Sequence, residues 1–133
     1  MNSVSLHPGL IDTQILIEMR AGLVDAHRFA IALMRSARIE VSELSAIALL
    51  TQCSTPVALQ KELSFLSSSV VHRITARVSE RAFRLLAKLP PPCGLTADDA
   101  IVAATAAEHK LTLYTLDPAR FVPVSGLNAL RPY

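Results

Sequence analysis

Hydrophobic residues follow two patterns along this chain, short apolar runs and longer stretches with helical spacing. The short runs are apolar or rich in β-branched residues, and they predict strands at 9–11, 38–42, 70–74, 111–114 and 122–124. The longer stretches have the period of amphipathic helices and predict helices at 13–20, 23–35, 44–50, 57–65, 76–89 and 96–109, with one helical turn at 118–121. Short strands alternating with helices are typical of a mostly parallel sheet covered by helices, so the pattern alone predicts an α/β fold.

The predicted elements form one continuous series. No internal repeat, low-complexity tract or linker separates them, so we expect residues 1–133 to form a single domain. Hydrophobic residues make up 51% of the sequence, which excludes a disordered chain. Tryptophan is absent and aromatic residues are few, so alanine and the branched aliphatic residues must fill the core.

The charge balance argues against non-specific nucleic-acid binding. The chain has 13 basic and 11 acidic residues, a net charge of +2, so a nucleic acid would need a local basic patch. Arg20 and Arg120 each follow an acidic segment closely, which makes them the better candidates for a position near a substrate groove. Arg28, Arg35 and Arg38 are further candidates. Four more basic residues repeat with helical spacing, which a solvated helix face also explains: Arg77, Arg81, Arg84 and Lys88.

Cysteine usage and hydropathy indicate the compartment. Two cysteines distant in sequence, Cys53 and Cys93, are interpreted as ordinary thiols in a reducing compartment. Residues 1–8 are polar and lack the features of a leader, and no apolar run approaches the ~18 residues of a membrane span. We therefore predict a cytoplasmic protein.

Three aspartates fall where an open parallel sheet binds ligands. Asp12 and Asp117 each follow a predicted strand, and Asp99 lies in the first turn of an alanine-rich helix. Ligands bind at the carboxyl ends of such strands, so the three carboxylates are expected to converge on one edge. Converging carboxylates repel one another unless a cation compensates them. Ligands that are all oxygen favour Mg²⁺ or Mn²⁺ over Zn²⁺.

Helix capping is an alternative explanation for each of these acids. Asp12 precedes the helix that starts at Thr13, and Asp117 is followed by proline in the position usual after an N-cap. Thr96 and Asp99 have the spacing of a capping box. A carboxylate can cap a helix and bind a metal at the same time, so both interpretations stay open.

The three acidic segments resemble motifs of the PIN-domain family, in particular the VapC-like toxin ribonucleases. The segment 10–17, LIDTQILI, resembles the opening strand and helix of these toxins. The segment 99–106, DAIVAATA, is similar to their aspartate at the head of an alanine-rich helix, and 113–121, LYTLDPARF, is similar to their closing strand. The motifs occur in the family's order and spacing over nearly the whole chain.

The resemblance implies a fold, an activity and partners. The fold would be a three-layer PIN-like domain, a central mostly parallel sheet of about five strands flanked by helices. The activity would be Mg²⁺- or Mn²⁺-dependent endonucleolytic cleavage of RNA. Asp12 and Asp99 would be the principal metal ligands, Asp117 would complete the site directly or through water, and Thr115 would orient water or a carboxylate. Such toxins usually form homodimers and are silenced by a cognate antitoxin.

One position departs from the family's pattern. Many members carry an active-site glutamate in stretches resembling Ser-Glu-Leu-Ser-x-x-Glu, and here Ala48 stands at the final position of the stretch 42–48. Glu43 does not replace it easily, because a residue five positions earlier lies about 140° away around an α-helix. Glu43 is instead expected to complement the helix dipole. Gln14 in place of the usual asparagine is a milder departure.

Three functions therefore stay open. The first is a toxin endoribonuclease of a toxin–antitoxin pair. The second is a catalytically weakened PIN domain that binds RNA or a partner protein, which Ala48 favours. The third is an unrelated α/β domain whose aspartates only cap helices.

Overall fold

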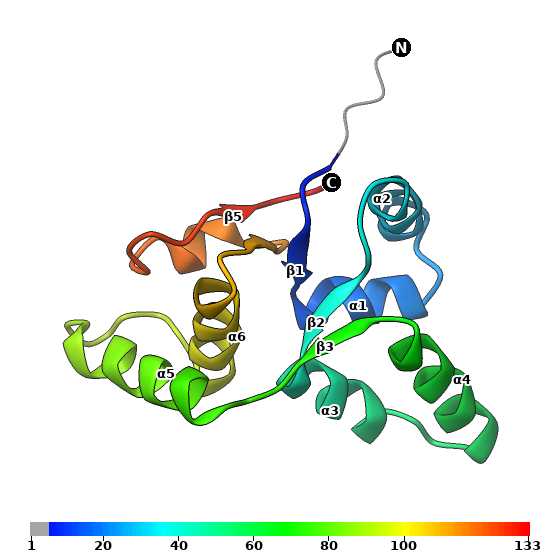
Figure 1. Cartoon of the computed structure of the whole chain (residues 1–133), viewed down its shortest axis with the longest axis horizontal. Helices are drawn as coiled ribbons and strands as arrows, with labels where there is room; N and C mark the ends of the chain where they lie inside the picture. The colour runs from blue at the N-terminus through cyan, green and yellow to red at the C-terminus, as the bar shows by residue number, and fades with distance from the viewer. Residues whose placement is uncertain (1–5) are drawn as a thin grey trace, which may run out of the picture.

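A five-stranded parallel sheet lies at the centre of the computed structural model, which describes residues 6–133 (Figure 1). The strand order is β3-β2-β1-β4-β5, and every neighbouring pair is parallel. The strands are β1 (Gly9–Ile11), β2 (Glu40–Ser42), β3 (Val70–His72), β4 (Thr112–Tyr114) and β5 (Ala129–Leu130). The prediction of a five-stranded α/β sheet is confirmed.

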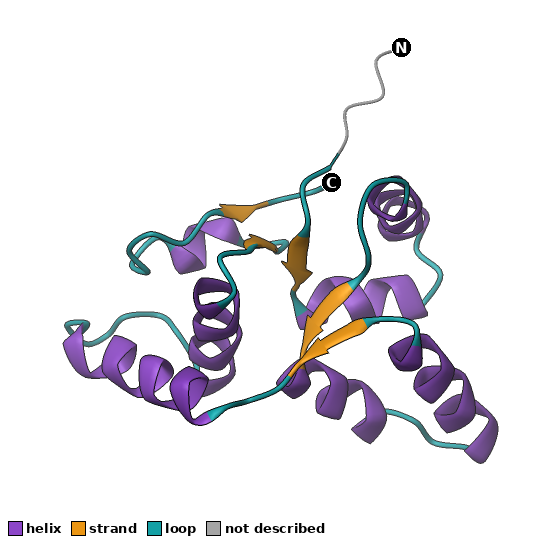
Figure 2. Cartoon of the chain, in the orientation of Figure 1, coloured by secondary structure: helices purple, strands orange, loops and turns teal. Residues whose placement is uncertain are grey.

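Helices flank the sheet on both sides (Figure 2). They are α1 (Thr13–Arg20), α2 (Val24–Met34), α3 (Glu43–Thr51), α4 (Pro56–Ser67), α5 (Ala76–Lys88) and α6 (Ala97–Glu108), with a 3-10 turn, η1 (Pro118–Phe121). All were predicted to within a few residues. Side-chain caps explain several starts: Ser42, Thr55, Thr75 and Thr96 each accept a hydrogen bond from the backbone N–H three residues on.

Alternation along the central strands explains the three layers. Ile11 and Tyr114 pack into a core with residues of α1, α2 and α3, such as Leu16. Their neighbours Leu10 and Leu113 point to the other face and pack into a second core with residues of α6 and η1. Side chains on successive strand positions point to opposite faces, so strands with no polar face must be covered on both sides.

The predicted strand at 122–124 is wrong. These residues form a turn after η1, and Val124 is buried in the second core. The β-branched pair suggested a strand, but Pro123 between them has no N–H to donate to a ladder. The fifth strand is β5, where Leu113 N–H donates to the carbonyl of Asn128 and Thr115 N–H to that of Leu130, both at 2.9 Å.

The predictions for the cysteines, for the first residues and for membrane spans are compared with the structure in turn. Cys53 and Cys93 are both free thiols, as expected. The prediction for residues 1–8 falls partly on residues 1–5, which lie outside the described residues. None of the helices in residues 6–133 has the length and apolar content that crossing a bilayer requires.

Gly9 allows β1 and β4 to approach each other. A Cβ built there would lie 2.7 Å from the carbonyl oxygen of Thr112 and 2.5 Å from a ring carbon of Tyr114. The first contact is with backbone and cannot be relieved by a rotamer change. Gly9→Ala is therefore expected to lower the free energy of unfolding by about 1–3 kcal/mol, measured by urea denaturation. Gly126→Ala is an unsuitable control because of its positive φ, so Ala129→Gly in β5, on the other side of β4, is used, and a smaller loss there is expected.

Candidate active site

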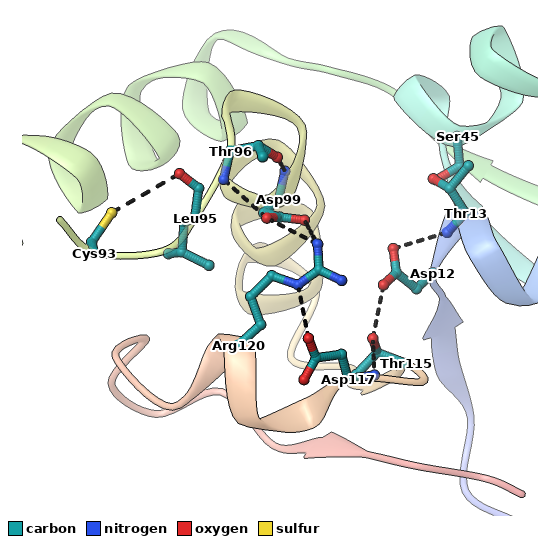
Figure 3. A network of polar contacts seen from close by, with 10 residues as sticks. All are labelled: Asp12, Thr13, Ser45, Cys93, Leu95, Thr96, Asp99, Thr115, Asp117 and Arg120. Atoms are coloured by element: carbon teal, nitrogen blue, oxygen red, sulfur yellow. Dashed lines mark hydrogen bonds and ion pairs between the residues drawn. The ribbon is translucent and has the colours of Figure 1, made fainter.

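Asp12 and Thr115 lie together at the carboxyl edge of the sheet because β1 and β4 are adjacent and parallel (Figure 3). Asp12 N–H donates to the carbonyl of Tyr114 at 2.9 Å, which continues the strand pairing up to the aspartate. One carboxylate oxygen, Oδ1, accepts from Thr13 N–H at 2.9 Å, and Oδ2 accepts from the Thr115 hydroxyl at 2.8 Å. Two fixed donors therefore set the orientation of the Asp12 carboxylate.

Asp99 reaches the same region from the N-terminus of α6. It completes a capping box: its N–H donates to Thr96 Oγ1 at 3.1 Å, and its Oδ2 accepts from Thr96 N–H at 2.9 Å. Nη1 of Arg120 donates to Oδ1 at 3.2 Å and to Oδ2 at 3.4 Å. Asp99 is 8% exposed, so this nearly buried carboxylate is held from two sides.

Asp117 lies at the outer rim. Its backbone N–H donates to Thr115 Oγ1 at 3.2 Å, while its side chain is 54% exposed and lies 3.5 Å from Nε of Arg120. Thr115 thus links Asp12 to the backbone of Asp117. The exposed Asp117 carboxylate is held less firmly than the other two.

The capping interpretation has different outcomes for the three acids. Asp12 accepts from the first N–H of α1, and Asp99 forms the expected capping box. Asp117 occupies the N-cap position of η1, but within the described part of the chain its carboxylate accepts no capping hydrogen bond. Since Asp12 and Asp99 keep further oxygen lone pairs, capping does not prevent either from binding a ligand.

Electrostatics single out Asp12. Burial raises the pKa of its carboxyl group above the ordinary 3.8, and the nearby charge of Asp99 raises it further. The hydrogen bonds from Thr115 and Thr13 and the charge of Arg120 lower the pKa and offset part of this effect. A carboxylate whose ionised form is disfavoured by burial and by a second carboxylate is a site for compensation by a cation.

Thr115→Val is expected to raise the pKa of Asp12 further, because valine cannot donate the hydrogen bond that favours the ionised form. Thr115 is 1% exposed, so loss of its hydroxyl is also expected to lower the free energy of unfolding by about 1 kcal/mol. An NMR titration of the Asp12 carboxyl carbon measures the pKa. Thr115→Ser keeps the hydroxyl and is the control; an equal pKa in the valine variant would contradict the assigned cause.

The side chains that could bind a metal at this edge fit a hard divalent cation. Their ligand atoms are all oxygens, and the two carboxylates that lie closest to the end of β1 and the start of α6 are those of Asp12 and Asp99. Across residues 6–133, no three His, Cys, Asp or Glu side chains are already arranged to hold a metal ion. Mg²⁺ keeps several waters and commonly uses one or two carboxylates together with substrate phosphates, so two carboxylates satisfy its needs.

Position 48 lies on the helix next to this edge. Helix α3 packs against both α1 and α6. Ser45 Oγ lies 2.7 Å from Thr13 Oγ1, beside Asp12, and Ala48 follows one helical turn later. Glu43 is engaged elsewhere: its carboxylate accepts from Ile74 N–H at 3.0 Å and from Arg73 at 2.7 Å, and the bond from Ile74 is the main reason that its pKa is lowered. Glu43 therefore does not replace a glutamate at position 48.

The candidate cations separate into those at the edge and those elsewhere. Arg120 lies at the acidic edge, as proposed, but Arg20 does not, since it binds Glu62 of α4 at 2.5 Å. Arg77 and Arg81 of α5 both pair with Glu108 of α6. Together with Arg84 and Lys88 they line a cleft of about 640 Å³ between these helices. The basic face of α5 is thus partly neutralised by acids.

Two contacts of the site were not predicted from the sequence. Ser45 is fully buried and joins Thr13 to the N-cap Ser42, and its position three residues after Ser42 was the available signal. Arg120 was expected near this edge because it follows Asp117 closely, but its contact with Asp99, 21 residues away, had no signal in the local sequence.

Comparisons with known proteins give a consistent result. The family model described as "PIN domain" matches residues 9–125. No curated protein matches the chain. A toxin–antitoxin complex from Klebsiella pneumoniae contains a chain with 26% identity and a TM-score of 0.77, with 94% of this chain and 98% of that chain covered.

Two further solved structures share the fold. VapBC2 from Rickettsia felis, bound to a promoter DNA fragment, has 18% identity and a TM-score of 0.74, and the match covers 91% of this chain and 96% of that one. FitAcB from Neisseria gonorrhoeae has 18% identity and a TM-score of 0.71, with 92% and 96% covered. At such identities the likeness shows the fold alone.

Proposed function

Because this chain belongs to the PIN domain family, we propose that it is a metal-dependent endoribonuclease and the toxin of a toxin–antitoxin pair. The observation that carries the proposal is the convergence of Asp12 and Asp99 on one sheet edge, with Thr115 bonded to Asp12. In this proposal residues 1–133 act as a single PIN-like domain. The structural similarity to chains of toxin–antitoxin complexes supports the toxin role.

Each residue of the edge has a proposed role. Asp12 and Asp99 hold a Mg²⁺ or Mn²⁺ ion, and Asp117 completes the site directly or through water. When bound, the ion supplies an activated water and stabilises charge on the phosphate. Thr115 keeps the Asp12 carboxylate turned toward the site by its hydrogen bond, and Thr13 N–H holds the other oxygen.

The proposed partners follow from the same family. We propose a cognate antitoxin protein as the inhibitor, RNA as the substrate, a homodimer as the assembly and the cytoplasm as the location. The antitoxin partner is supported by the complexes to which this chain is structurally similar. RNA fits a site whose ion would bind phosphate oxygens.

Cleavage of a mixed RNA pool by the purified protein, free of any bound partner, tests the function. Fragments are expected with Mn²⁺ or Mg²⁺ and not with EDTA, and a DNA pool of the same lengths shows whether the 2′-hydroxyl matters. Intact RNA at every metal concentration, with protein that is folded by circular dichroism, would contradict the nuclease.

A weakened PIN domain that binds RNA or a partner without cutting is the second candidate, and Ala48 is the observation that favours it. Ala48→Glu adds a carboxylate on the helix beside Ser45, so it is expected to tighten Mn²⁺ binding and to raise the cleavage rate, each about tenfold. Calorimetry measures the affinity, and Ala48→Gln is the isosteric control without charge. Equal Mn²⁺ affinity of Ala48→Glu and Ala48→Gln would show that position 48 has no access to the ion.

A further inference from the structure

The guanidinium group of Arg120 occupies the space between the carboxylates of the acidic edge (Figure 3). Nη1 binds both oxygens of Asp99, and Nε lies on the Asp117 side, so one side chain bridges two of the three aspartates. The charge of Arg120 also acts on Asp12. All three carboxylates proposed for the metal site therefore interact with the same internal cation.

This bridge uses the oxygens that a metal ion would need. Oδ2 of Asp99 already accepts from Thr96 N–H, so Oδ1 is the oxygen with more capacity left, and Arg120 donates to it at 3.2 Å. A divalent cation at Oδ1 would place two like-charged groups within contact distance, since guanidinium is always protonated. Oδ1 keeps a further lone pair, so the competition between Arg120 and the ion is electrostatic: the positive guanidinium opposes a divalent cation on the same carboxylate.

The side chain of Arg120 has room to move away from the two aspartates. Its side chain is 37% exposed, on a 3-10 turn of four residues. The turn itself is anchored by Phe121, which is 2% exposed in the second core. The guanidinium can therefore rotate toward solvent, giving up its contacts with the two aspartates and with the Phe121 ring 5.9 Å away, while Phe121 keeps the backbone of the turn anchored.

We propose that Arg120 is an internal competitor of the divalent cation: its guanidinium holds Asp99 and Asp117 in the metal-free protein, and its charge there weakens metal binding. This inference rests on the proposed function, since it concerns the same metal site. It assigns Arg120 a positioning role. The competition raises the metal concentration that the site requires, and it keeps the carboxylates paired when no ion is bound.

Mn²⁺ binding measured by electron paramagnetic resonance tests the proposal without reference to activity. Arg120→Gln is expected to bind Mn²⁺ about tenfold more tightly than the unaltered protein, because the neutral amide does not compete for Asp99. Arg120→Lys keeps the charge and is expected to stay close to the unaltered protein. Arg84→Gln removes one charge from α5, where Arg84 pairs with Glu80, and is expected to leave Mn²⁺ affinity unchanged.

The outcomes separate this inference from the proposed function. Equal or weaker Mn²⁺ binding by Arg120→Gln, with clear binding by the unaltered protein, would overturn the competition and leave the metal site standing. If Arg84→Gln binds Mn²⁺ as tightly as Arg120→Gln does, the gain in affinity comes from the lower net charge alone, which would also overturn the proposed competition. Absence of Mn²⁺ binding in every protein, Arg120→Gln included, would overturn the proposed metal site and this inference together.

Discussion

Asp12→Asn is expected to lower RNA cleavage by on the order of a thousandfold while making the metal-free protein more stable at pH 7. The loss follows because one of the two carboxylates proposed to hold the ion is gone. Removing a single group that stabilises charge in a transition state typically costs about a hundred- to a thousandfold in rate. Cleavage rates in Mn²⁺ measure the first effect, and urea denaturation in EDTA measures the second.

The stability gain follows from the raised pKa of Asp12. Burial disfavours the ionised carboxylate of Asp12 in the folded protein. At pH values above the pKa that Asp12 has in the folded protein, its ionisation therefore lowers the free energy of unfolding. The contribution of Asp12 to stability is thus largest below the ordinary pKa of 3.8 and is lost as the pH rises through the folded value. The advantage of Asp12→Asn should therefore shrink as the pH is lowered from 7 toward that range.

Asp98→Asn is the matched control for this experiment. Asp98 lies beside Asp99 in the first turn of α6 and is exposed. Its substitution removes the same charge, and its effect on stability is expected to stay within about 0.5 kcal/mol with cleavage unchanged. A cleavage rate for Asp12→Asn close to that of Asp98→Asn would contradict the role of Asp12.

Arg20→Met is expected to lower the free energy of unfolding by about 2–4 kcal/mol. The Glu62 side chain is 2% exposed, and its Oε2 lies 2.5 Å from Nη2 of Arg20, so the substitution leaves a buried carboxylate without its cation. Removing one partner of a fully buried pair typically costs about 3–5 kcal/mol, and the 41% exposure of Arg20 reduces this figure. Arg20 also lies 5.6 Å from the centre of the Phe65 ring, a cation–π contact that methionine cannot make.

The double variant Arg20→Met/Glu62→Leu distinguishes the ion pair from simple packing. Apolar side chains in place of both charges remove the need for compensation, so the double variant should be more stable than Arg20→Met alone. Urea denaturation of the single and double variants measures both effects. Two results would show that the pair does not hold α1 to α4: a loss of stability in the double variant equal to the sum of the losses in Arg20→Met and Glu62→Leu, or a loss below about 1 kcal/mol for Arg20→Met.

Sequence patterns predicted most of the fold because its signals are local. Apolar strands with no polar face, such as the one containing Leu10 and Ile11, required helices on both sides, and threonine caps marked where helices such as α6 begin. The β5 strand has only two residues and pairs with β4 through backbone hydrogen bonds. Two side chains are too few to show the pattern of a strand, so β5 was not predicted. Residues 122–124 had the β-branched composition of a strand, but Pro123 has no N–H to donate to a strand ladder.

The site was predictable only as far as topology determines it. Asp12 and Thr115 end adjacent parallel strands, so their meeting follows from the strand order, and Asp99 is placed by its capping box. Partners far apart in sequence escaped prediction. Glu62 lies in a helix that was predicted, but its burial against Arg20, 42 residues away, was not. The catalytic roles of Asp12, Asp99, Asp117 and Thr115 stay predictions.

The most direct test of the metal site is anomalous diffraction from crystals soaked in Mn²⁺. An anomalous peak is expected at the carboxyl edge of the sheet, within coordination distance of oxygens of both Asp12 and Asp99, with the guanidinium of Arg120 turned away from it. A peak bound elsewhere, or no peak at a Mn²⁺ concentration that supports RNA cleavage, would contradict the assignment of this edge as the metal site.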